Sequence, residues 1–211
     1  MCARFYRYKD LKNLYIRFKI AEVLSVLEPQ YNIAPTDKAL VIPSTSGPRK
    51  AVLMPFAIKN PWIHKGLLLN MRAESFVNKP GFRKYLNQRC LVIADGFIEW
   101  EHKGTGKNSQ TIPYRVDPTD GEPIGLAGVY TDEGFVIITT EPNKVVGKFH
   151  DRMPVILRRE DEDVWLDPNV QEFSKLIPML APYPSEALLA HKISPSANSS
   201  KNKEKTVLNK L

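Results

Sequence analysis

Cys2 stands where its side chain could carry chemistry that a cysteine inside a chain cannot. Its small size allows removal of Met1, which would expose a thiol and a free α-amine on adjacent carbons. The α-amine of a chain has a pKa of about 7.7–8.0 and a thiol one of about 8.5, so both are partly nucleophilic near neutral pH. An aldehyde can condense with the amine, and the thiol can then close a thiazolidine ring. The alternative is a chance cysteine at an unimportant terminus, and position alone favours that alternative.

Three polar residues elsewhere in the chain are of types suited to such a condensation. Asn70 lies in an apolar, strand-like run and can orient an amine through hydrogen bonds without adding charge. Glu99 lies between Ile98 and Trp100, so partial burial would raise its pKa and let it donate a proton. His150 has an ordinary pKa of about 6.5 and can give and take protons near neutrality. Two of them also have a plain structural interpretation, which the residues alone favour: Glu99 as the solvent-facing member of an alternating strand, and His150 as a local cap or ion-pair partner.

The elements that must position these residues are short strands alternating with short helices. The spacing of apolar residues predicts a helix from Asp10, its N-cap, to about residue 27. Strands are predicted at residues 3–8, 39–43, 51–55, 66–72, 90–96, 97–102, 110–116, 124–131, 135–140 and 153–157, and helices at 79–88, 142–149, 160–166 and 171–177. This pattern favours an α+β fold with an antiparallel, barrel-like sheet and short peripheral helices. From Pro195 the chain turns polar and basic, which predicts a single domain at residues 1–194 and a flexible tail at 195–211.

Composition narrows the class of protein. The chain has 211 residues, of which 43% are hydrophobic and 25% charged, enough for one sizeable core. No apolar run reaches the roughly 18 residues that span a bilayer, and the N-terminus lacks the apolar core of a secretory signal, so a cytoplasmic protein with no membrane partner is predicted. The net charge is +7, of which the tail contributes +3, so nucleic acid is a candidate partner. Two Cys and four His show no zinc-ligand spacing, and no metal or cofactor is predicted.

Four segments of the chain resemble, in order, the motifs of the SRAP family (SOS response-associated peptidase). They are MCARF at 1–5; YNIAPT at 31–36; NMRAES at 70–75, followed by KPGFR at 79–83 and ADGFIEW at 94–100; and IITTEPN at 137–143 with HDRMPVIL at 150–157. Together they span about residues 1–167. Any one of these motifs is a weak signal, but on the ordered set the chain is identified as a member of the family.

The resemblance implies a DNA-damage protein of the SOS response that binds single-stranded DNA and crosslinks covalently to abasic sites through its N-terminal cysteine. It implies a peptidase that releases its own Met1, lyase-type chemistry where the crosslink is reversed, and association with the nucleoid when bound to DNA. A replication-associated partner is left unidentified. The catalytic residues that it implies are Cys2, Asn70, Glu99 and His150, and the predicted DNA-binding set is Arg4, Asn32, Pro35, Arg72, Arg83, Trp100 and Arg152.

Two stretches depart from the family pattern. The family usually begins MCGRF, whereas this chain has Ala3, which matters if the backbone there needs positive φ or a close approach of DNA. Where members usually show a Trp-Gly-Leu-Ile-Pro-like segment, this chain has Ala51, Val52 and, shortly after, Ala57. A missing tryptophan would remove a surface for stacking against DNA, for which Trp62 is a nearby substitute. These departures bear on DNA affinity more than on the covalent chemistry.

Three other functions remain open from the sequence. Glutamine amidotransferases also use an N-terminal cysteine, but they tend to follow it with Gly-Ile and to use an Asn-Gly pair, and this chain has no Asn-Gly dipeptide. A peptidase acting on other proteins could use Cys2 as nucleophile and His150 as base. A DNA-binding module without chemistry would bind single strands equally well after Cys2→Ala.

Overall fold

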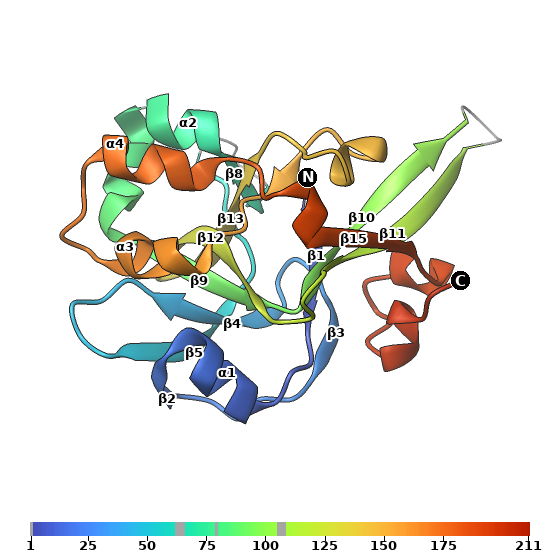
Figure 1. Cartoon of the computed structure of the whole chain (residues 1–211), viewed down its shortest axis with the longest axis horizontal. Coiled ribbons are helices and arrows are strands. Elements are labelled where there is room, and N and C mark those ends of the chain that lie inside the picture. The colour runs from blue at the N-terminus through green and yellow to red at the C-terminus, as the bar shows by residue number, and fades with distance from the viewer. Residues whose placement is uncertain (1, 62–65, 79, 105–108) are drawn as a thin grey trace.

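The computed structural model of the chain describes residues 2–61, 66–78, 80–104 and 109–211 (Figure 1). Its strands are β1 (Arg4–Arg7), β2 (Ile20–Val23), β3 (Gln30–Ile33), β4 (Lys38–Pro43), β5 (Arg49–Pro55), β6 (Ile58–Lys59), β7 (Leu67–Leu68), β8 (Asn70–Arg72), β9 (Arg89–Ala94), β10 (Gly96–Lys103), β11 (Gln110–Pro118), β12 (Ile124–Thr131), β13 (Gly134–Thr140), β14 (Met153–Pro154) and β15 (Leu188–Lys192).

Short helices separate these strands. The α-helices are α1 (Leu11–Phe18), α2 (Ala73–Asn78), α3 (Glu162–Leu166) and α4 (Phe173–Leu176). The 3-10 helices are η1 (Pro80–Asn87), η3 (Val146–Lys148), η4 (Arg159–Asp161), η5 (Ile177–Leu180), η6 (Ser185–Ala187), η7 (Pro195–Asn198) and η8 (Lys205–Leu208). Among the described residues, no helix is long and apolar enough to cross a membrane.

Two large sheets form the body of the described chain. One has five strands in the order β15-β11-β10-β1-β3; the other runs β14-β13-β12-β9-β4-β5-β2, with β8 added against β13. Most neighbours are antiparallel, but β8 pairs with β13 and β2 with β5 in parallel. The predicted α+β class is confirmed, with large mixed sheets that, within the residues described, do not close into a barrel.

Strand alternation divides the interior into layers. On β9, Cys90 and Val92 face a core between the two sheets, whereas Leu91 and Ile93 face a second core under the helices. In Figure 1, α2, α3 and α4 lie on the helix side of the eight-stranded sheet, and the five-stranded sheet lies beyond its other side. β9 is buried along its whole length because both of its faces are covered.

The first predicted helix is too long. α1 begins after its N-cap Asp10, whose carboxylate accepts from the Asn13 N–H at 2.9 Å, but it ends at Phe18. Lys19 adopts a left-handed conformation with φ 51°, and β2 follows at once, pairing with β5. Pairing with an existing strand therefore overrides the helical spacing beyond this point.

The segment of residues 195–211, predicted to be a flexible tail, packs against the body in the structure. Its apolar residues Ala197, Val207 and Leu208 are buried against Tyr6 and Ile98 on the outer face of the five-stranded sheet. That face carries apolar side chains, and the C-terminal residues, which include η7 and η8, supply the layer that covers them. The connection between the predicted strands at 97–102 and 110–116 lies largely outside the described residues.

Candidate active site

A pocket of about 520 Å³ opens beside β10 near the start of the N-terminal strand. In the five-stranded sheet β1 begins at Arg4, which pairs with Ile98, so β10 continues past the start of β1. This register brings the N-terminal residues next to Glu99. The pocket is lined by Ala3, Arg4, Glu99, Trp100, His102, Thr111, His150 and Asn198.

Cys2 is fully buried at the inner end of this site. Its Sγ donates to the Arg4 carbonyl at 3.8 Å, and the Asn70 Nδ2 donates to the Cys2 carbonyl at 2.9 Å. Asn70 lies on β8, where it pairs with Ile137 of β13. A residue of the eight-stranded sheet therefore binds the backbone of Cys2. Among the described residues, the buried Asn70 Oδ1 has no hydrogen-bond partner.

The Cys2 thiol is held in its protonated form. Burial raises its pKa well above that of an ordinary thiol, and the negative charge of Glu99 raises it further. A reaction that uses this sulfur as a nucleophile therefore needs a neighbouring group that accepts the thiol proton.

Glu99 is buried, with 1% of its surface exposed. Burial raises its pKa to about 7, so the carboxyl group exchanges a proton near neutrality. Phe97 and Glu99 share the face of β10 that points between the two sheets, which explains why a glutamate in an alternating strand faces inward here. Glu99 Oε1 has no hydrogen-bond partner in the described part of the chain.

His150 faces Glu99 across the pocket, its Nε2 lying 3.8 Å from Glu99 Oε2. The Val146 carbonyl accepts from the His150 backbone N–H at 3.0 Å, which fixes the turn after η3. His150 Nδ1 accepts from the Arg152 backbone N–H at 3.0 Å and lies 3.1 Å from Asp151 Oδ1, which leaves Nε2 as the ring nitrogen on the side of Glu99. Burial lowers the pKa of His150.

The structure thus brings the four predicted catalytic residues together. Asn70 contacts Cys2, Glu99 acts electrostatically on the Cys2 thiol, and His150 lies beside Glu99. The arrangement can hold a nucleophile at a fixed place and move a proton between a carboxyl group and an imidazole. The catalytic roles themselves stay predictions.

The predicted phosphate-binding arginines differ in their exposure and in whether a carboxylate pairs with the guanidinium. Arg4 lies over the Trp100 ring, 5.6 Å from its centre, and its Nη1 donates to Asn32 Oδ1 and to the Ala197 carbonyl, each at 3.2 Å. Arg72 is exposed at the end of β8. Arg152 is buried, and its guanidinium binds both oxygens of Glu74, at 2.8 and 2.9 Å, and the Thr139 carbonyl at 2.7 Å. A DNA phosphate would have to share or displace Glu74 to reach Arg152.

The other predicted DNA-binding residues fall in different surroundings. Asn32 is buried behind Arg4, Pro35 is half-buried in the turn after β3, and Trp100 forms part of the pocket wall. The side chain of Arg83, like Trp62, lies outside the described residues. These assignments remain predictions.

The departures from the family pattern do not disturb this site. Ala3 lines the pocket, and it is not among the described non-glycine residues with positive φ, so alanine is compatible with the backbone there. Ala51 is fully buried in the core under the helices, and Ala57 is almost fully buried. The alanine at position 51 therefore removes no exposed stacking surface.

Sequence reasoning missed four residues around the site. Asn198 belongs to the segment taken for a tail, where apolar residues at 197, 207 and 208 were the available signal. His102 and Thr111 face each other across the β10–β11 hairpin, His102 Nδ1 lying 3.4 Å from Thr111 Oγ1. Glu74 stood inside the NMRAES motif, but nothing in the sequence pointed to its pairing with Arg152.

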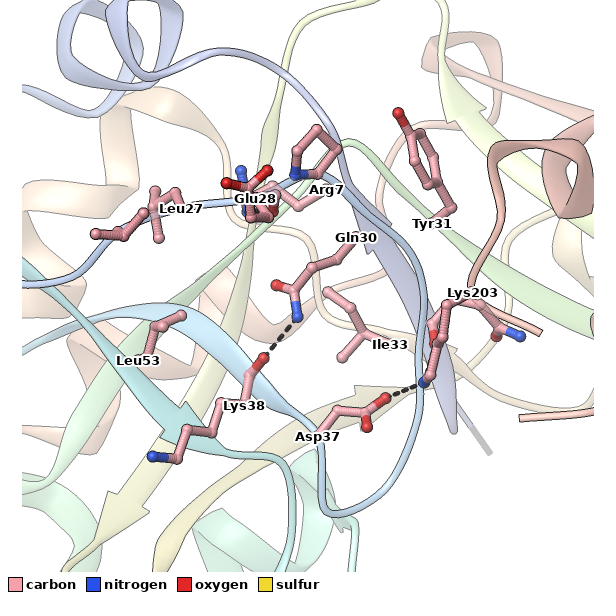
Figure 2. A pocket seen from close by; sticks show the side chains of 13 residues that line it. Arg7, Leu27, Glu28, Gln30, Tyr31, Ile33, Asp37, Lys38, Leu53 and Lys203 are labelled. Atoms are coloured by element: carbon pink, nitrogen blue, oxygen red, sulfur yellow. Dashed lines mark hydrogen bonds and ion pairs between the residues drawn. The ribbon is translucent and has the colours of Figure 1, made fainter. Parts of the chain in front are cut away.

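A second pocket, of about 360 Å³, has Asn32 in its lining, and Figure 2 shows residues that surround it. Ile33 and Leu53 form apolar parts of its lining, and an ion pair between Asp37 and Lys203 lies at one side. It contains none of the four predicted catalytic residues. Among the described residues, no group of three or more His, Cys, Asp or Glu is arranged to hold a metal ion.

Comparison with known proteins gives a family and named relatives. The sequence profile of the SOS response associated peptidase (SRAP) family matches residues 1–200. The chain is 33% identical over 218 residues to the abasic site processing protein YoqW of Bacillus subtilis (strain 168), covering 96% of each chain. It is 27% identical over 146 residues to the abasic site processing protein YedK of Escherichia coli (strain K12), covering 65% of this chain and 64% of YedK.

Solved structures share the fold. A crystal structure of a protein from Bacteroides thetaiotaomicron superposes with a TM-score of 0.82 and covers 100% of both chains, at 24% sequence identity. A phage-related protein from Bordetella bronchiseptica superposes with a TM-score of 0.75, covering 91% of this chain and 94% of its own, also at 24% identity. At this identity the likeness concerns the fold alone.

Proposed function

The chain belongs to the SRAP family, and from that premise we propose that it processes abasic sites in DNA by forming a covalent crosslink through Cys2. The names of the relatives YoqW and YedK support the substrate. The observation that carries the proposal is the hydrogen bond from Asn70 to the Cys2 carbonyl, which holds the N-terminal residue beside Glu99 and His150. We assign the protein to the cytoplasm, on the nucleoid when it is bound to DNA.

Release of Met1 comes first, because Cys2 must have a free α-amine. The Cys2 sulfur attacks the Met1 carbonyl carbon, the C–N bond to Cys2 breaks, and the thiol proton moves to the departing nitrogen. Water then hydrolyses the thioester, which frees methionine and restores the thiol. Glu99 is suited to carry the proton from sulfur to nitrogen, because its pKa of about 7 allows it both to accept and to donate.

Crosslinking uses the ring-opened sugar of an abasic site, which carries an aldehyde. The α-amine adds to the aldehyde carbon, and protonated Glu99 helps the resulting hydroxyl leave as water, which gives an imine. The Cys2 sulfur then adds to the same carbon and its proton passes to the nitrogen, closing a thiazolidine ring with a net loss of one water. His150, whose Nε2 faces Glu99, is positioned to relay protons during these steps. The same steps in reverse would release the crosslink.

DNA binding rests on the basic residues around the pocket. An abasic nucleotide has no base to read, so contacts to phosphates position the strand. Arg4 and Arg72 are the phosphate-binding candidates that make no ion pair among the described residues. Single-stranded DNA is the preferred substrate, because the reacting aldehyde must reach Glu99 and Cys2 below the surface.

A denaturing gel tests this proposal. Met-processed protein is incubated with a single-stranded oligonucleotide carrying one abasic site, with Cys2→Ala alongside. Cys90→Ala is the matched control, because Cys90 is equally buried in the same core. We expect a shifted band with the wild type and Cys90→Ala and none with Cys2→Ala. Cleavage of added peptides without a DNA adduct would overturn the proposal in favour of a peptidase acting on other proteins.

A further inference from the structure

The C-terminal segment (residues 195–211) touches three side chains of the predicted DNA-binding set. The Ala197 carbonyl accepts from Arg4 Nη1 at 3.2 Å, and the Asn198 Oδ1 accepts from the Trp100 indole N–H at 2.8 Å. The carbonyls of Ser199 and Asn202 accept from Asn32 Nδ2 at 3.0 and 2.9 Å. One short stretch, residues 197–202, therefore fixes side chains that come from β1, β3 and β10.

This stretch is itself anchored at both ends. Asn198 Nδ2 donates to the Thr111 carbonyl of β11 at 3.3 Å. Beyond it, Lys203 pairs with Asp37 and donates to the Asn32 carbonyl at 2.8 Å (Figure 2). Burial of Val207 and Leu208 holds the remainder of the segment on the sheet. The contacts to the pocket are thus made by a stretch that is held to the body on both sides of them.

The consequence for Arg4 is a fixed orientation. Its guanidinium lies over the indole of Trp100. Its Nη1 donates to two uncharged acceptors, Asn32 Oδ1 and the Ala197 carbonyl. Within the described residues, Arg4 Nη2 donates to no acceptor and no carboxylate lies within ion-pair distance of Arg4. No carboxylate of the described residues therefore neutralises the positive charge of Arg4. Its Nη2 can donate to an anion next to the pocket that Glu99 lines.

We propose that Asn198 is a positioning residue for DNA binding: by holding the Trp100 indole, it fixes the Arg4 guanidinium where Nη2 can bind a phosphate beside the abasic nucleotide. The inference rests on the proposed function and adds to it a residue from the segment that the sequence indicated to be a tail. Asn198 accepts through Oδ1 and donates through Nδ2 at the same time, so alanine loses both contacts.

The test combines affinity, salt dependence and a double-mutant cycle. Binding of a single-stranded oligonucleotide is measured by fluorescence anisotropy for the wild type, Asn198→Ala, Trp100→Phe and the double variant. Asn209→Ala is the matched control, an exposed asparagine of the same segment whose side chain makes no hydrogen bond within the described residues. Maximal crosslinking rates and thermal unfolding are recorded on the same samples.

We expect Asn198→Ala to raise the Kd by up to about tenfold, the upper end of the usual contribution of a neutral hydrogen bond. The slope of log Kd against log salt should fall by about 0.7, the value for one phosphate contact on a single strand. In the Trp100→Phe background, where the indole N–H is absent, Asn198→Ala should have little further effect. The DNA concentration at half-maximal crosslinking should rise, with the maximal rate changed less than the Kd.

Each other outcome has a definite meaning. If Asn198→Ala leaves the Kd unchanged, the positioning role is overturned and the proposed function still stands. The same holds if Asn198→Ala raises the Kd without changing the salt slope, and raises it as much in the Trp100→Phe background as in the wild type. Failure of the wild type to bind or crosslink DNA would overturn both.

Discussion

Glu99 and His150 lie 3.8 Å apart, and their surroundings shift the two pKa values in opposite directions. Burial raises the pKa of Glu99 to about 7 and lowers the pKa of His150. Both shifts favour the uncharged form of each group, so near pH 7 Glu99 is divided between its acid and carboxylate forms beside a neutral imidazole. A pair of this kind can donate a proton from one member and accept it at the other.

The rate of adduct formation should depend on pH through Glu99. If protonated Glu99 expels the hydroxyl of the carbinolamine, the rate falls as pH rises through about 7, the pKa of Glu99. Glu99→Gln should lose this limb of the profile and slow the reaction by about 10²–10⁴-fold, the usual contribution of a general acid. Single-turnover crosslinking between pH 5 and 9, with saturating DNA, measures both effects.

Glu101→Gln is the control for that profile, because Glu101 is on the same strand but its carboxylate pairs with Lys103 and accepts from Tyr114. It should keep the alkaline limb. A Glu99→Gln profile that retains the limb at about pH 7 would assign it to another group.

The free energy of unfolding should depend on pH through the ionisation of Glu99. The folded-state pKa of Glu99 lies above its unfolded value of 4.5, so its stabilising effect is fully present below pH 4.5 and is lost as pH rises through about 7. Glu99→Gln carries no charge, so relative to the wild type its free energy of unfolding should increase by about 3 kcal/mol between pH 4 and pH 8. Urea denaturation at the two pH values measures this difference, and an equal offset at both would refute it.

Asn70→Asp should impair the chemistry and spare DNA binding. The substitution keeps the shape but replaces the Nδ2 donor with an oxygen that repels the Cys2 carbonyl, so the N-terminal residue shifts. Misplacement of a nucleophile by about 1 Å costs about 100-fold in rate. Crosslinking at saturating DNA should fall by that order, with the Kd for intact single strands changed less than about threefold. A Kd that rises in parallel with the loss of rate would mean that Asn70 serves DNA binding.

Glu74→Gln distinguishes two roles for Arg152. Glu74 binds the Arg152 guanidinium with both oxygens, and this pairing lowers the pKa of Glu74. If Arg152 holds a phosphate, removal of the competing carboxylate should tighten DNA binding several-fold and make its salt dependence steeper. Glu172→Gln, which removes an exposed carboxylate paired with Lys175, serves as control. Unchanged affinity in Glu74→Gln would limit Arg152 to a structural role.

Leu208→Ala tests the packing of the C-terminal segment. Leu208 is buried against the outer face of the five-stranded sheet, so its truncation should lower the free energy of unfolding by about 2–5 kcal/mol. Leu211→Ala, three residues away with 72% of Leu211 exposed, should change it by less than about 0.5 kcal/mol. If chemical denaturation shows equally small changes in the free energy of unfolding for both variants, the segment would be a flexible tail, as the sequence predicts.

The sequence pointed to four residues that the fold brings together, but it did not predict their surroundings. Cys2, Asn70, Glu99 and His150 were indicated by residue type and by ordered motifs, and the fold brings them together. The burial of Glu99 was harder to predict, because its strand alternates like one with a solvent-exposed face. Only the second sheet, packed over Phe97 and Glu99, decides that this face is interior.

Elements whose formation depends on distant partners were missed. The helix α1 ends at Phe18 because the next residues form β2, which pairs with β5. The local spacing of apolar residues does not predict this pairing. Residues 195–211 are polar on average, and Val207 and Leu208 are buried only because they pack on the outer apolar face around Tyr6 and Ile98. The ion pair of Arg152 with Glu74 is likewise visible only once β14 and α2 are placed.

Intact mass spectrometry of the DNA adduct tests the central claim most directly. Met-processed protein is incubated with single-stranded DNA carrying one abasic site, and the product is digested and mapped. A mass equal to protein plus DNA less one water, located on the N-terminal peptide and absent in Cys2→Ser, is the predicted result. Stability to heat and alkali would identify the thiazolidine rather than the imine. An adduct that persists in Cys2→Ser, or no adduct with the processed wild type, would contradict the account.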